Sequence, residues 1–234
     1  MTPESPSSPA SGPAVPIDGD WQRARRPEQK AERRRAILEA TTALLDEAGV
    51  EGATLSEIAR RAGLSKANCY RYFESREAIL LELTLAESSE WMGDIQTRLG
   101  PLAGSGDVDA VAAAFVAATV GRPRVCTLYS AIYSVMERNV SPPAVAEFKR
   151  DFHERVFGST DAIRRALPDL SVEATDQFVL YLGFFIAGAW PSANPAPGVA
   201  EILQRQGHPT QSRDFGEILL AHTRVVLRGL LAEG

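Results

Sequence analysis

A short run of side chains at residues 65–73 carries hydrogen-bonding groups of the kind that read the edges of DNA bases. Asn68 presents an amide that can bond adenine at two positions, and Lys66 presents an ammonium group that can bond guanine. The small Ala67 between them allows close approach to a thymine methyl group, and the Tyr70 hydroxyl can donate to a phosphate. The chemistry that this run predicts is hydrogen bonding in a DNA groove.

Two short helices joined by a tight turn are predicted to position these groups. Thr54 lies three residues before Glu57, which predicts a capping box: the Thr54 hydroxyl caps the first helix, and the Glu57 side chain returns to the Thr54 backbone N–H. Gly63 ends that helix, because a residue without a Cβ readily adopts the left-handed conformation. Ser65 caps the second helix, which is expected over residues 66–73. This arrangement is typical of a helix-turn-helix.

The basic residues of the chain are concentrated next to this element. The net charge of the 234 residues is −5, which argues against a protein that coats nucleic acid indiscriminately. Residues 21–35, directly ahead of the helix pair, nevertheless carry seven basic residues against two acidic ones. An ordinary solvated face can hold such a run, but its position favours DNA, and we assign Arg33 and Arg34 to the DNA contacts.

Residues 30–80 resemble the DNA-binding domain of the tetracycline-repressor (TetR) family of bacterial one-component regulators. The third helix of that family follows a pattern of small polar, Lys, two small residues, apolar, Tyr, any residue, aromatic or His, and Phe. This chain matches the pattern with SKANCYRYF at residues 65–73. The resemblance implies phosphate contacts from Thr54, Tyr70, Tyr72 and Arg76. It implies base contacts from Lys66, Ala67 and Asn68.

Two positions depart from the family pattern. Cys69 stands where the family usually has Leu or Ile, which makes that core position smaller. Arg76 replaces the commoner Lys, which should preserve the positive charge.

The fold class predicted for the whole chain is all-α, because no segment shows strand-like alternation of comparable strength. Residues 1–20 are rich in Pro and Ser and are expected to be a disordered tail. Residues 21–80 form a three-helix helix-turn-helix DNA-binding domain with a basic N-terminal arm, and residues 81–234 form an α-helical ligand-binding and dimerisation bundle. The helices are expected from residue 27 or 28 to an inward-facing Ala48, and at 77–99, 108–120, 122–139, 142–167, 172–190, 199–205 and 214–232.

The two long helices near the C-terminus are apolar on more than one face. The segments 172–190 and 214–232 therefore need burial on more than one face, and one monomer can cover only part of each. A second subunit is the expected cover. The resemblance implies the same arrangement, since members of the family pair through their last two long helices. We therefore expect a homodimer.

The same bundle carries side chains suited to an apolar pocket for a small-molecule effector. Aromatic residues at helical spacing more often serve packing than ligand binding, so both uses stay open for each of them. The candidate ligand contacts are Phe115, Tyr129, Tyr133, Met136, Phe152, Phe178, Tyr181 and Trp190.

Other classes of protein find little support in the sequence. Paired catalytic carboxylates, a G-x-S-x-G motif, a Gly-rich phosphate loop and an H-E-x-x-H motif are all missing, which predicts no catalytic residues and no cofactor. Cys69 and Cys126 are isolated, as are His153 and His222, so no metal site or disulfide is expected, in keeping with a cytoplasmic protein. The apolar run at 178–190 is shorter than the ~20 residues of a membrane span.

These observations predict a dimeric, ligand-responsive transcriptional regulator. As is usual in the family, it would be a repressor that binds double-stranded DNA at a palindromic operator and is released by a small, mostly apolar molecule. Activation stays open, because the direction of control depends on where the operator lies relative to a promoter. The alternative is a helical interaction protein that keeps the fold but does not switch on a ligand.

Overall fold

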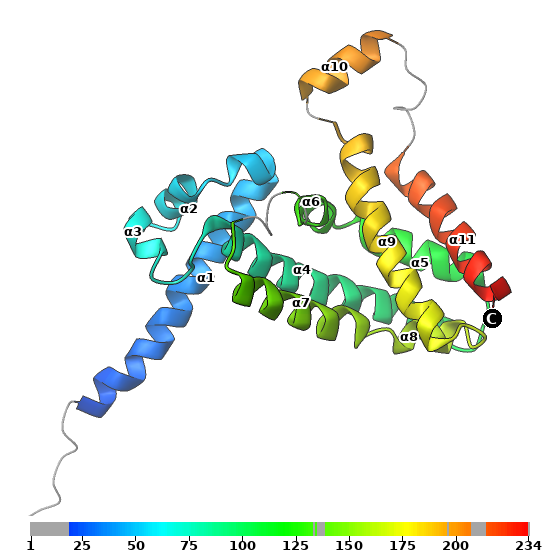
Figure 1. Ribbon diagram of the computed structural model, residues 1–234, viewed down its shortest axis with the longest axis horizontal. Helices are drawn as coiled ribbons and strands as arrows, with labels where there is room; N and C mark the ends of the chain where they lie inside the picture. Colours follow the sequence, from blue (N-terminus) through cyan, green and yellow to red (C-terminus); the bar gives the residue numbers. More distant parts are fainter. Residues whose placement is uncertain (1–18, 133, 135–138, 196, 207–213, 234) are drawn as a thin grey trace, which may run out of the picture.

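The computed structural model describes residues 19–132, 134, 139–195, 197–206 and 214–233. Every regular element in these ranges is helical, which confirms the all-α class (Figure 1). Most of the tail predicted to be disordered lies outside the described residues, as do Tyr133 and Met136. The last two residues of that predicted tail, Gly19 and Asp20, are instead the first residues of a helix.

The first helix is longer than the sequence predicts. Helix α1 spans Gly19–Gly52 and contains Pro27, so the prediction that the helix starts at residue 27 or 28 is wrong. The proline removes one backbone hydrogen bond without ending the helix. At its other end, Gly49 has a φ of 65°, which interrupts the regular helix where the sequence predicts its end. Ala48 is exposed rather than inward-facing.

The helix-turn-helix packs on the second half of α1. Helix α2 spans Leu55–Arg61 and helix α3 spans Lys66–Cys69. Together with the start of α4 they bury one end of the apolar core of the protein, to which Cys69 contributes a fully buried side chain. Other members of this core are Ile37, Leu44, Ile58, Phe73, Ile79 and Leu80.

Helix α4, Arg76–Leu99, joins this domain to the rest of the chain as one continuous element. A short 3-10 turn, η1, follows at Gly100–Leu102. The remaining helices are α5 (Val108–Val120), α6 (Pro123–Ala131), α7 (Pro142–Phe157), α8 (Asp161–Ala166), α9 (Val172–Ala193), α10 (Pro197–Gln206) and α11 (Phe215–Glu233). Figure 1 shows α7 running along α4, and α9 and α11 lying side by side.

Helix α9 runs three residues past the predicted end, through Pro191, and α10 is longer than predicted by three residues. Two other helices differ more from the prediction. Helix α6 ends at Ala131, well before residue 139. The helix expected over 142–167 is divided into α7 and α8, because the chain tightens after Phe157. There the Thr160 hydroxyl and the Thr160 N–H both bond the Phe157 carbonyl oxygen, at 2.9 and 3.4 Å, in competition with regular helix pairing.

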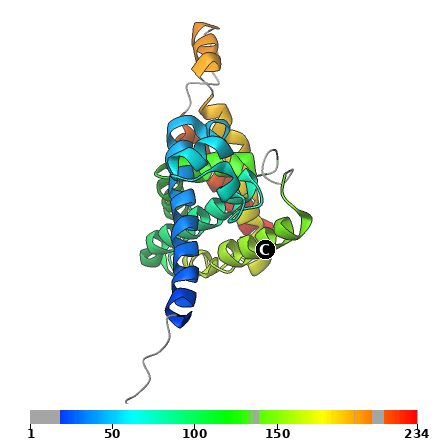
Figure 2. The same cartoon turned by 90° about the vertical axis from the view of Figure 1, so that its left-hand side faces the viewer.

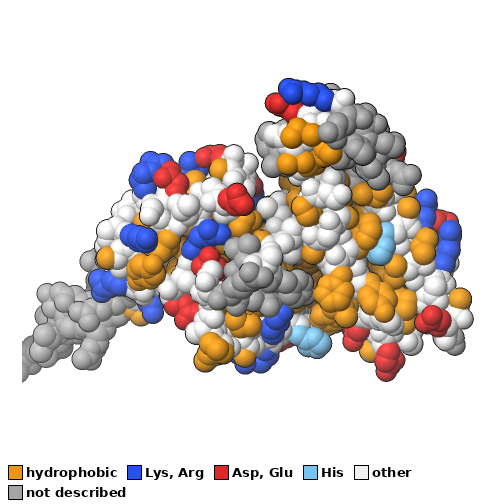
Figure 3. All heavy atoms as spheres, turned by 45° about the horizontal axis from the view of Figure 1, so that its top comes forward, with side chains coloured by type: hydrophobic (Ala, Val, Ile, Leu, Met, Phe, Trp, Pro, Cys, Tyr) orange, Lys and Arg blue, Asp and Glu red, His pale blue; other side chains and the backbone are white. Residues whose placement is uncertain are grey.

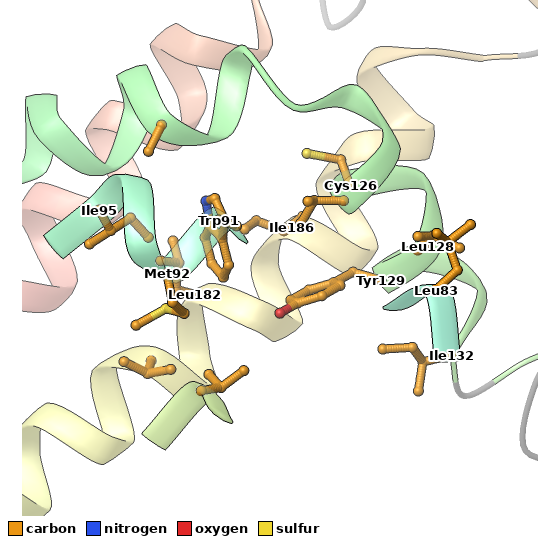
Figure 4. Close-up of a cluster of buried hydrophobic side chains, with 14 of the residues drawn as sticks. Leu83, Trp91, Met92, Ile95, Cys126, Leu128, Tyr129, Ile132, Leu182 and Ile186 are labelled. Atoms are coloured by element: carbon orange, nitrogen blue, oxygen red, sulfur yellow. The ribbon is translucent and has the colours of Figure 1, made fainter. Parts of the chain in front are cut away.

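Edge-to-face aromatic pairs hold the C-terminal helices together. The rings of Phe115 and Phe178 lie 5.0 Å apart at 84° and join α5 to α9. Trp91 and Tyr129, 5.7 Å apart at 84°, join α4 to α6, and Figure 4 shows both within one buried cluster. This geometry is favourable for aromatic pairs. Helix α10, in contrast, stands away from the other helices in two perpendicular views (Figures 1 and 2).

None of the described helices is by itself long and apolar enough to cross a membrane. Helices α5 and α6 reach that length and composition only as a pair, which is bent by 83°. Both helices contribute residues to the buried core of the protein.

Candidate nucleic-acid interface and apolar cavity

Only one of the two hydrogen bonds of the predicted capping box forms at the start of α2. The Thr54 Oγ1 accepts the backbone N–H of Glu57 at 3.3 Å, as expected. The predicted bond from the Thr54 N–H to the Glu57 side chain is wrong, because the Thr54 N–H donates to the Gly52 carbonyl oxygen at 2.8 Å. The Glu57 carboxylate instead accepts from Arg60 Nε at 3.0 Å, and this bond lowers the pKa of Glu57.

The turn between α2 and α3 has the geometry that the sequence predicts. Gly63 has a φ of 66°, and the Leu64 N–H reaches back to the Ala59 carbonyl oxygen at 2.9 Å. The Ser65 Oγ then accepts the Asn68 N–H at 3.2 Å and caps α3. These bonds fix the start of α3, where Asn68 lies.

Helix α3 presents the predicted base-reading side chains to solvent. Lys66, Ala67 and Asn68 are exposed, and Tyr70 is 52% exposed, while Cys69 faces the core. The predicted length to residue 73 is wrong, since regular helix ends at Cys69. The N–H groups of residues 71 and 72 donate to carbonyl oxygens three residues back, at 3.1 and 2.9 Å, so the chain continues as a tighter turn.

An open groove of about 890 Å³ lies between α1 and the turn that follows α3. Its described lining holds three basic side chains and one acidic one. Such an excess of positive charge suits an anion such as a phosphate. The lining residues are Gln29, Lys30, Glu32, Arg33, Arg71 and Tyr72.

The two arginines assigned to DNA have different surroundings. Arg33 is exposed on the groove. Arg34 is partly exposed but paired within the protein: its Nε donates to the Glu82 carboxylate at 2.9 Å, and its Nη1 donates to the Tyr72 carbonyl oxygen at 2.7 Å. Its guanidinium carbon also lies 4.1 Å from the centre of the Phe73 ring. Arg34 therefore ties α1 to α4 and to the turn that follows α3.

The remaining phosphate candidates lie around α3. Thr54 is exposed at the start of α2, and Tyr72 is half-buried beside the groove. Arg76 opens α4 with a side chain 21% exposed, and its Nε lies 3.5 Å from a Glu77 carboxylate oxygen. The three residues thus flank the exposed side chains of α3.

Comparison with known proteins identifies both halves of the chain. A family profile described as bacterial regulatory proteins of the tetR family matches residues 37–83. A second profile, described as a tetracyclin repressor-like C-terminal domain, matches residues 85–234, which is more than half of the chain. The protein belongs to the TetR family. It is a transcriptional regulator of that family, which is not a family of enzymes.

The curated relatives resemble only part of the chain. The regulator BetI of Cronobacter sakazakii is 38% identical over 72 residues, which cover 30% of this chain and 35% of that protein. An uncharacterised helix-turn-helix regulator of Mycobacterium tuberculosis is 45% identical over 60 residues, which cover 26% of this chain and 28% of the relative. The chain thus matches about a third of the length of these relatives.

Solved structures share the fold over most of the chain. A putative TetR-family regulator from Mesorhizobium loti has a TM-score of 0.53 at 20% identity and covers 87% of this chain and 96% of its own. The Thermus thermophilus repressor FadR, solved in complex with lauroyl-CoA, has a TM-score of 0.54 at 18% identity and covers 84% and 94%. Identities this low show the fold alone.

The C-terminal domain of this TetR-family protein contains an apolar cavity of about 50 Å³. Helices α4, α6, α7 and α9 all contribute to its wall. Two of the predicted ligand contacts, Tyr129 and Phe152, line it. The sequence did not single out Trp91, Phe157, Leu180 or Phe184, which also line it, although Leu180 and Phe184 lie four apart in an apolar run.

The other described ligand candidates lie away from this cavity. Phe115 and Phe178 are buried against each other in the core. Trp190 donates from Nε1 to Thr127 Oγ1 at 3.1 Å. Tyr181 is 40% exposed, and Gln177 Nε2 donates to its hydroxyl oxygen at 2.6 Å.

Two polar contacts tie the C-terminal domain, which contains the cavity, to the DNA-binding domain. Arg124, in the first turn of α6, donates from Nε and Nη2 to the Asp46 carboxylate of α1 at 3.0 and 2.8 Å, and also bonds Glu87. Ser141, at the start of α7, donates its N–H and its hydroxyl to the Glu74 carboxylate at 2.9 and 3.0 Å. The first pair is 78 residues apart in sequence and the second 67, so local patterns do not reveal them.

The cysteines and histidines form no reactive or metal-binding group among the described residues. Burial raises the pKa of the Cys126 thiol to about 12 and raises that of Cys69 as well, so both stay protonated at neutral pH. Burial also lowers the pKa of His222, whose ring stacks on Phe185.

Replacing Arg34 by Ala should lower the free energy of unfolding by about 1–3 kcal/mol, because the half-buried Glu82 carboxylate loses its charged donor. The matched change Arg33→Ala removes an exposed arginine from the neighbouring position and should shift stability by less than ~0.5 kcal/mol. Chemical denaturation followed by circular dichroism measures both. Equal losses for the two variants would contradict the structural role of Arg34.

Proposed function

We propose that the protein is a dimeric, cytoplasmic repressor that binds a palindromic operator and is released when a small, mostly apolar molecule occupies the cavity. The exposure of Lys66, Ala67 and Asn68 at the capped start of α3, beside a basic groove, carries the DNA part of this proposal. The Thermus thermophilus neighbour is described as a repressor with a bound small molecule. That description favours repression and the binding of a small molecule.

Lys66, Ala67 and Asn68 form the proposed base-reading set, and Arg33, Thr54, Tyr70, Tyr72 and Arg76 form the proposed phosphate set. Arg34 leaves the phosphate set, because its guanidinium is already paired with the Glu82 carboxylate and the Tyr72 carbonyl oxygen. One short helix per chain reads few bases. Two DNA-binding domains related by a two-fold axis would therefore occupy two half-sites about one helical turn (~34–36 Å) or a multiple apart.

Exposed apolar side chains on α9 and α11 support a homodimer. Leu180 is 41% exposed, Phe184 is 49% exposed, and Val225 on α11 is 70% exposed. Figure 3 shows hydrophobic side chains gathered on this side of the molecule, where α9 runs below α10. Large apolar surfaces of this kind are usually covered by a partner. Leu227, by contrast, is fully buried in the chain's own core.

Two helices connect the cavity with the DNA-binding domain. Helix α4 carries Trp91 on the cavity wall and opens with Arg76 beside α3. Helix α6 carries Tyr129 on the wall and Arg124 on the ion pair to α1. A ligand that displaces the cavity-lining parts of α4 and α6 would move both connections and change the separation of the two DNA-binding domains of the dimer. It must then prefer the released state by the coupling free energy, typically ~1–3 kcal/mol.

Asn68→Ala should weaken binding to the operator by about 1–3 kcal/mol and leave binding to random DNA nearly unchanged, because it removes a base contact. Arg33→Ala should weaken both and reduce the slope of affinity against salt concentration, because it removes a phosphate contact. Fluorescence anisotropy with the protein's own upstream palindrome and a scrambled duplex measures these effects. Absence of any duplex binding by the unmodified protein would favour the helical interaction protein instead.

Val225→Glu should convert the dimer to a folded monomer, since a carboxylate would be buried without a partner in the interface. Val199→Glu on α10, a position of 48% exposure on the helix that stands away from α9 and α11 (Figures 1 and 2), is the control and should leave the dimer intact. Sedimentation and circular dichroism report assembly and folding. A folded monomer of the unmodified protein at micromolar concentration would contradict the proposal.

Asp46→Asn should reduce the coupling between effector and operator, because it weakens the contact through which α6 holds α1. Glu47→Gln, one residue on, is the control: Glu47 pairs with Arg61 of α2 at 2.6 Å, inside the DNA-binding domain. Calorimetry gives the affinity of an operator-releasing molecule with and without operator DNA. The ratio of the two affinities should fall toward one for Asp46→Asn alone, and an unchanged ratio would exclude this route.

A further inference from the structure

One face of α1 is buried in its second half and cationic in its first half. An α-helix turns by about 100° per residue, so Lys30, Arg33 and Ile37 lie within about 60° of one another around the axis. Ile37 is fully buried in the core. Lys30 and Arg33 are exposed and line the groove beside the turn that follows α3. The face that packs on the helix-turn-helix therefore continues along α1 as a basic face.

The first half of α1 extends beyond the helices that pack on its second half. Figure 2 looks at the side of the molecule on which α3 lies in Figure 1, and it shows α1 continuing well past α2 and α3. The side chains at 27–33 are all exposed. From Gly19 to Arg33 the helix rises by about 21 Å, at 1.5 Å per residue. This length of helix is left uncovered by the other described helices.

The cations of the groove lack the carboxylate partners that other arginines of the DNA-binding domain have. Three such arginines form salt bridges: Arg34 with Glu82, Arg60 with Glu57 and Arg61 with Glu47. Lys30, Arg33 and Arg71 have no such partner among the described residues, although Glu32 lines the same groove. Unpaired cations around one concave surface attract an anion from outside the protein.

The sequence around the groove supports the same charge. Residues 21–26, which precede the described lining, contain three arginines and no acidic residue, so they add positive charge. Arg23 and Arg26 each lie seven residues before Lys30 and Arg33 and so share their register on α1. Arg71 stands where the family pattern accepts any residue, so that pattern does not account for this cation.

The place of the groove indicates which anion it fits. It lies between α1 and residues 71 and 72, directly after the helix that exposes Lys66 and Asn68. A helix that enters the major groove of DNA has a phosphate strand on either side. The strand on the α1 side would lie in the protein groove, with a negative charge every ~3.4 Å along the axis. The uncovered part of α1 is long enough to follow several of these phosphates.

We propose that the groove and the uncovered half of α1 hold the DNA backbone beyond the base pairs that α3 reads. Lys30, Arg33 and Arg71 contact the strand in the groove, and the first turns of α1 follow the adjoining duplex. Each subunit thereby covers more backbone than its recognition helix requires. This inference rests on the proposed function, because it extends the same DNA interface.

Hydroxyl-radical footprinting of the full-length protein on its own upstream palindrome maps the protected backbone, and single base-pair substitutions mark the bases that are read. We expect protection to extend beyond those bases. In Lys30→Ala/Arg71→Ala the outer protection should be lost while the inner protection remains. The control Arg35→Ala/Arg165→Ala removes the same charge from exposed positions outside the groove and should keep the whole footprint. Identical footprints for the two double variants would overturn the proposal.

The salt dependence of binding gives a second readout. The loss of two phosphate contacts in Lys30→Ala/Arg71→Ala should lower the slope of log affinity against log salt by about 1.8, at ~0.9 per contact. The preference for the palindrome over a scrambled duplex should stay unchanged, because backbone contacts carry no sequence information directly. Fluorescence anisotropy measures both quantities. An unchanged slope, or a lost preference, would contradict a backbone role for these two residues.

Glu32→Gln provides a test that a loss of folding cannot imitate. Glu32 is the one acidic side chain of the described groove lining. Removal of its charge should strengthen binding to palindrome and scrambled duplex alike by about 1.5- to 5-fold, the range of an exposed charge interaction. Glu51→Gln, exposed at the other end of α1, is the control and should bind like the unmodified protein. Equal gains in both variants would reduce the effect to net charge and contradict a strand in the groove.

The outcomes separate this inference from the proposed function. Binding of the palindrome with normal base preference, but with no protection outside the bases that are read, would support the regulator and overturn the backbone contact by α1. Failure of the unmodified protein to bind any duplex would overturn both.

Discussion

The burial of α4 along one apolar core that runs through both parts of the chain is the constraint on which the rest of the structure depends. Ile79 and Leu80, near its start, pack in the DNA-binding domain, and Trp91 and Ile95, further along, pack in the C-terminal bundle. A helix packed at both ends cannot rotate or slide at one end alone, because close-packed interiors resist small displacements. The position of α3 relative to the bundle is therefore set by the same helix whose Trp91 lines the cavity.

The sequence predicts those parts of the fold that depend on local backbone chemistry. Thr54, Ser65 and Gly63 have specific conformational preferences, and the caps and the turn lie where those preferences indicate. Predictions that depend on long-range partners are less successful. Arg33 and Arg34 are indistinguishable in the sequence, and only the approach of Glu82 from α4 distinguishes them, by pairing with Arg34.

The cavity shows the same limit for the candidate ligand residues. Aromatic side chains at helical spacing identify the buried faces of α5, α6, α7 and α9, but they do not show which rings meet each other. Phe115 and Phe178 fill space by packing together, whereas Tyr129 and Phe152 border a space that stays open. Whether a ring packs or lines a cavity is decided by helix crossings, which the local pattern does not contain.

In the proposed complex with DNA, the length of α1 would affect the energetics of binding. The side chains from Pro27 to Arg33 are exposed, so this part of the helix is maintained mainly by its continuity with the packed part. Helical order without packing is marginal in water, and neighbouring like charges weaken it further. Phosphates that neutralise Lys30 and Arg33 would therefore also reduce the fraying of this segment. Part of the electrostatic gain would be offset by a loss of conformational entropy, and association would become more exothermic than the same contacts made by a rigid surface.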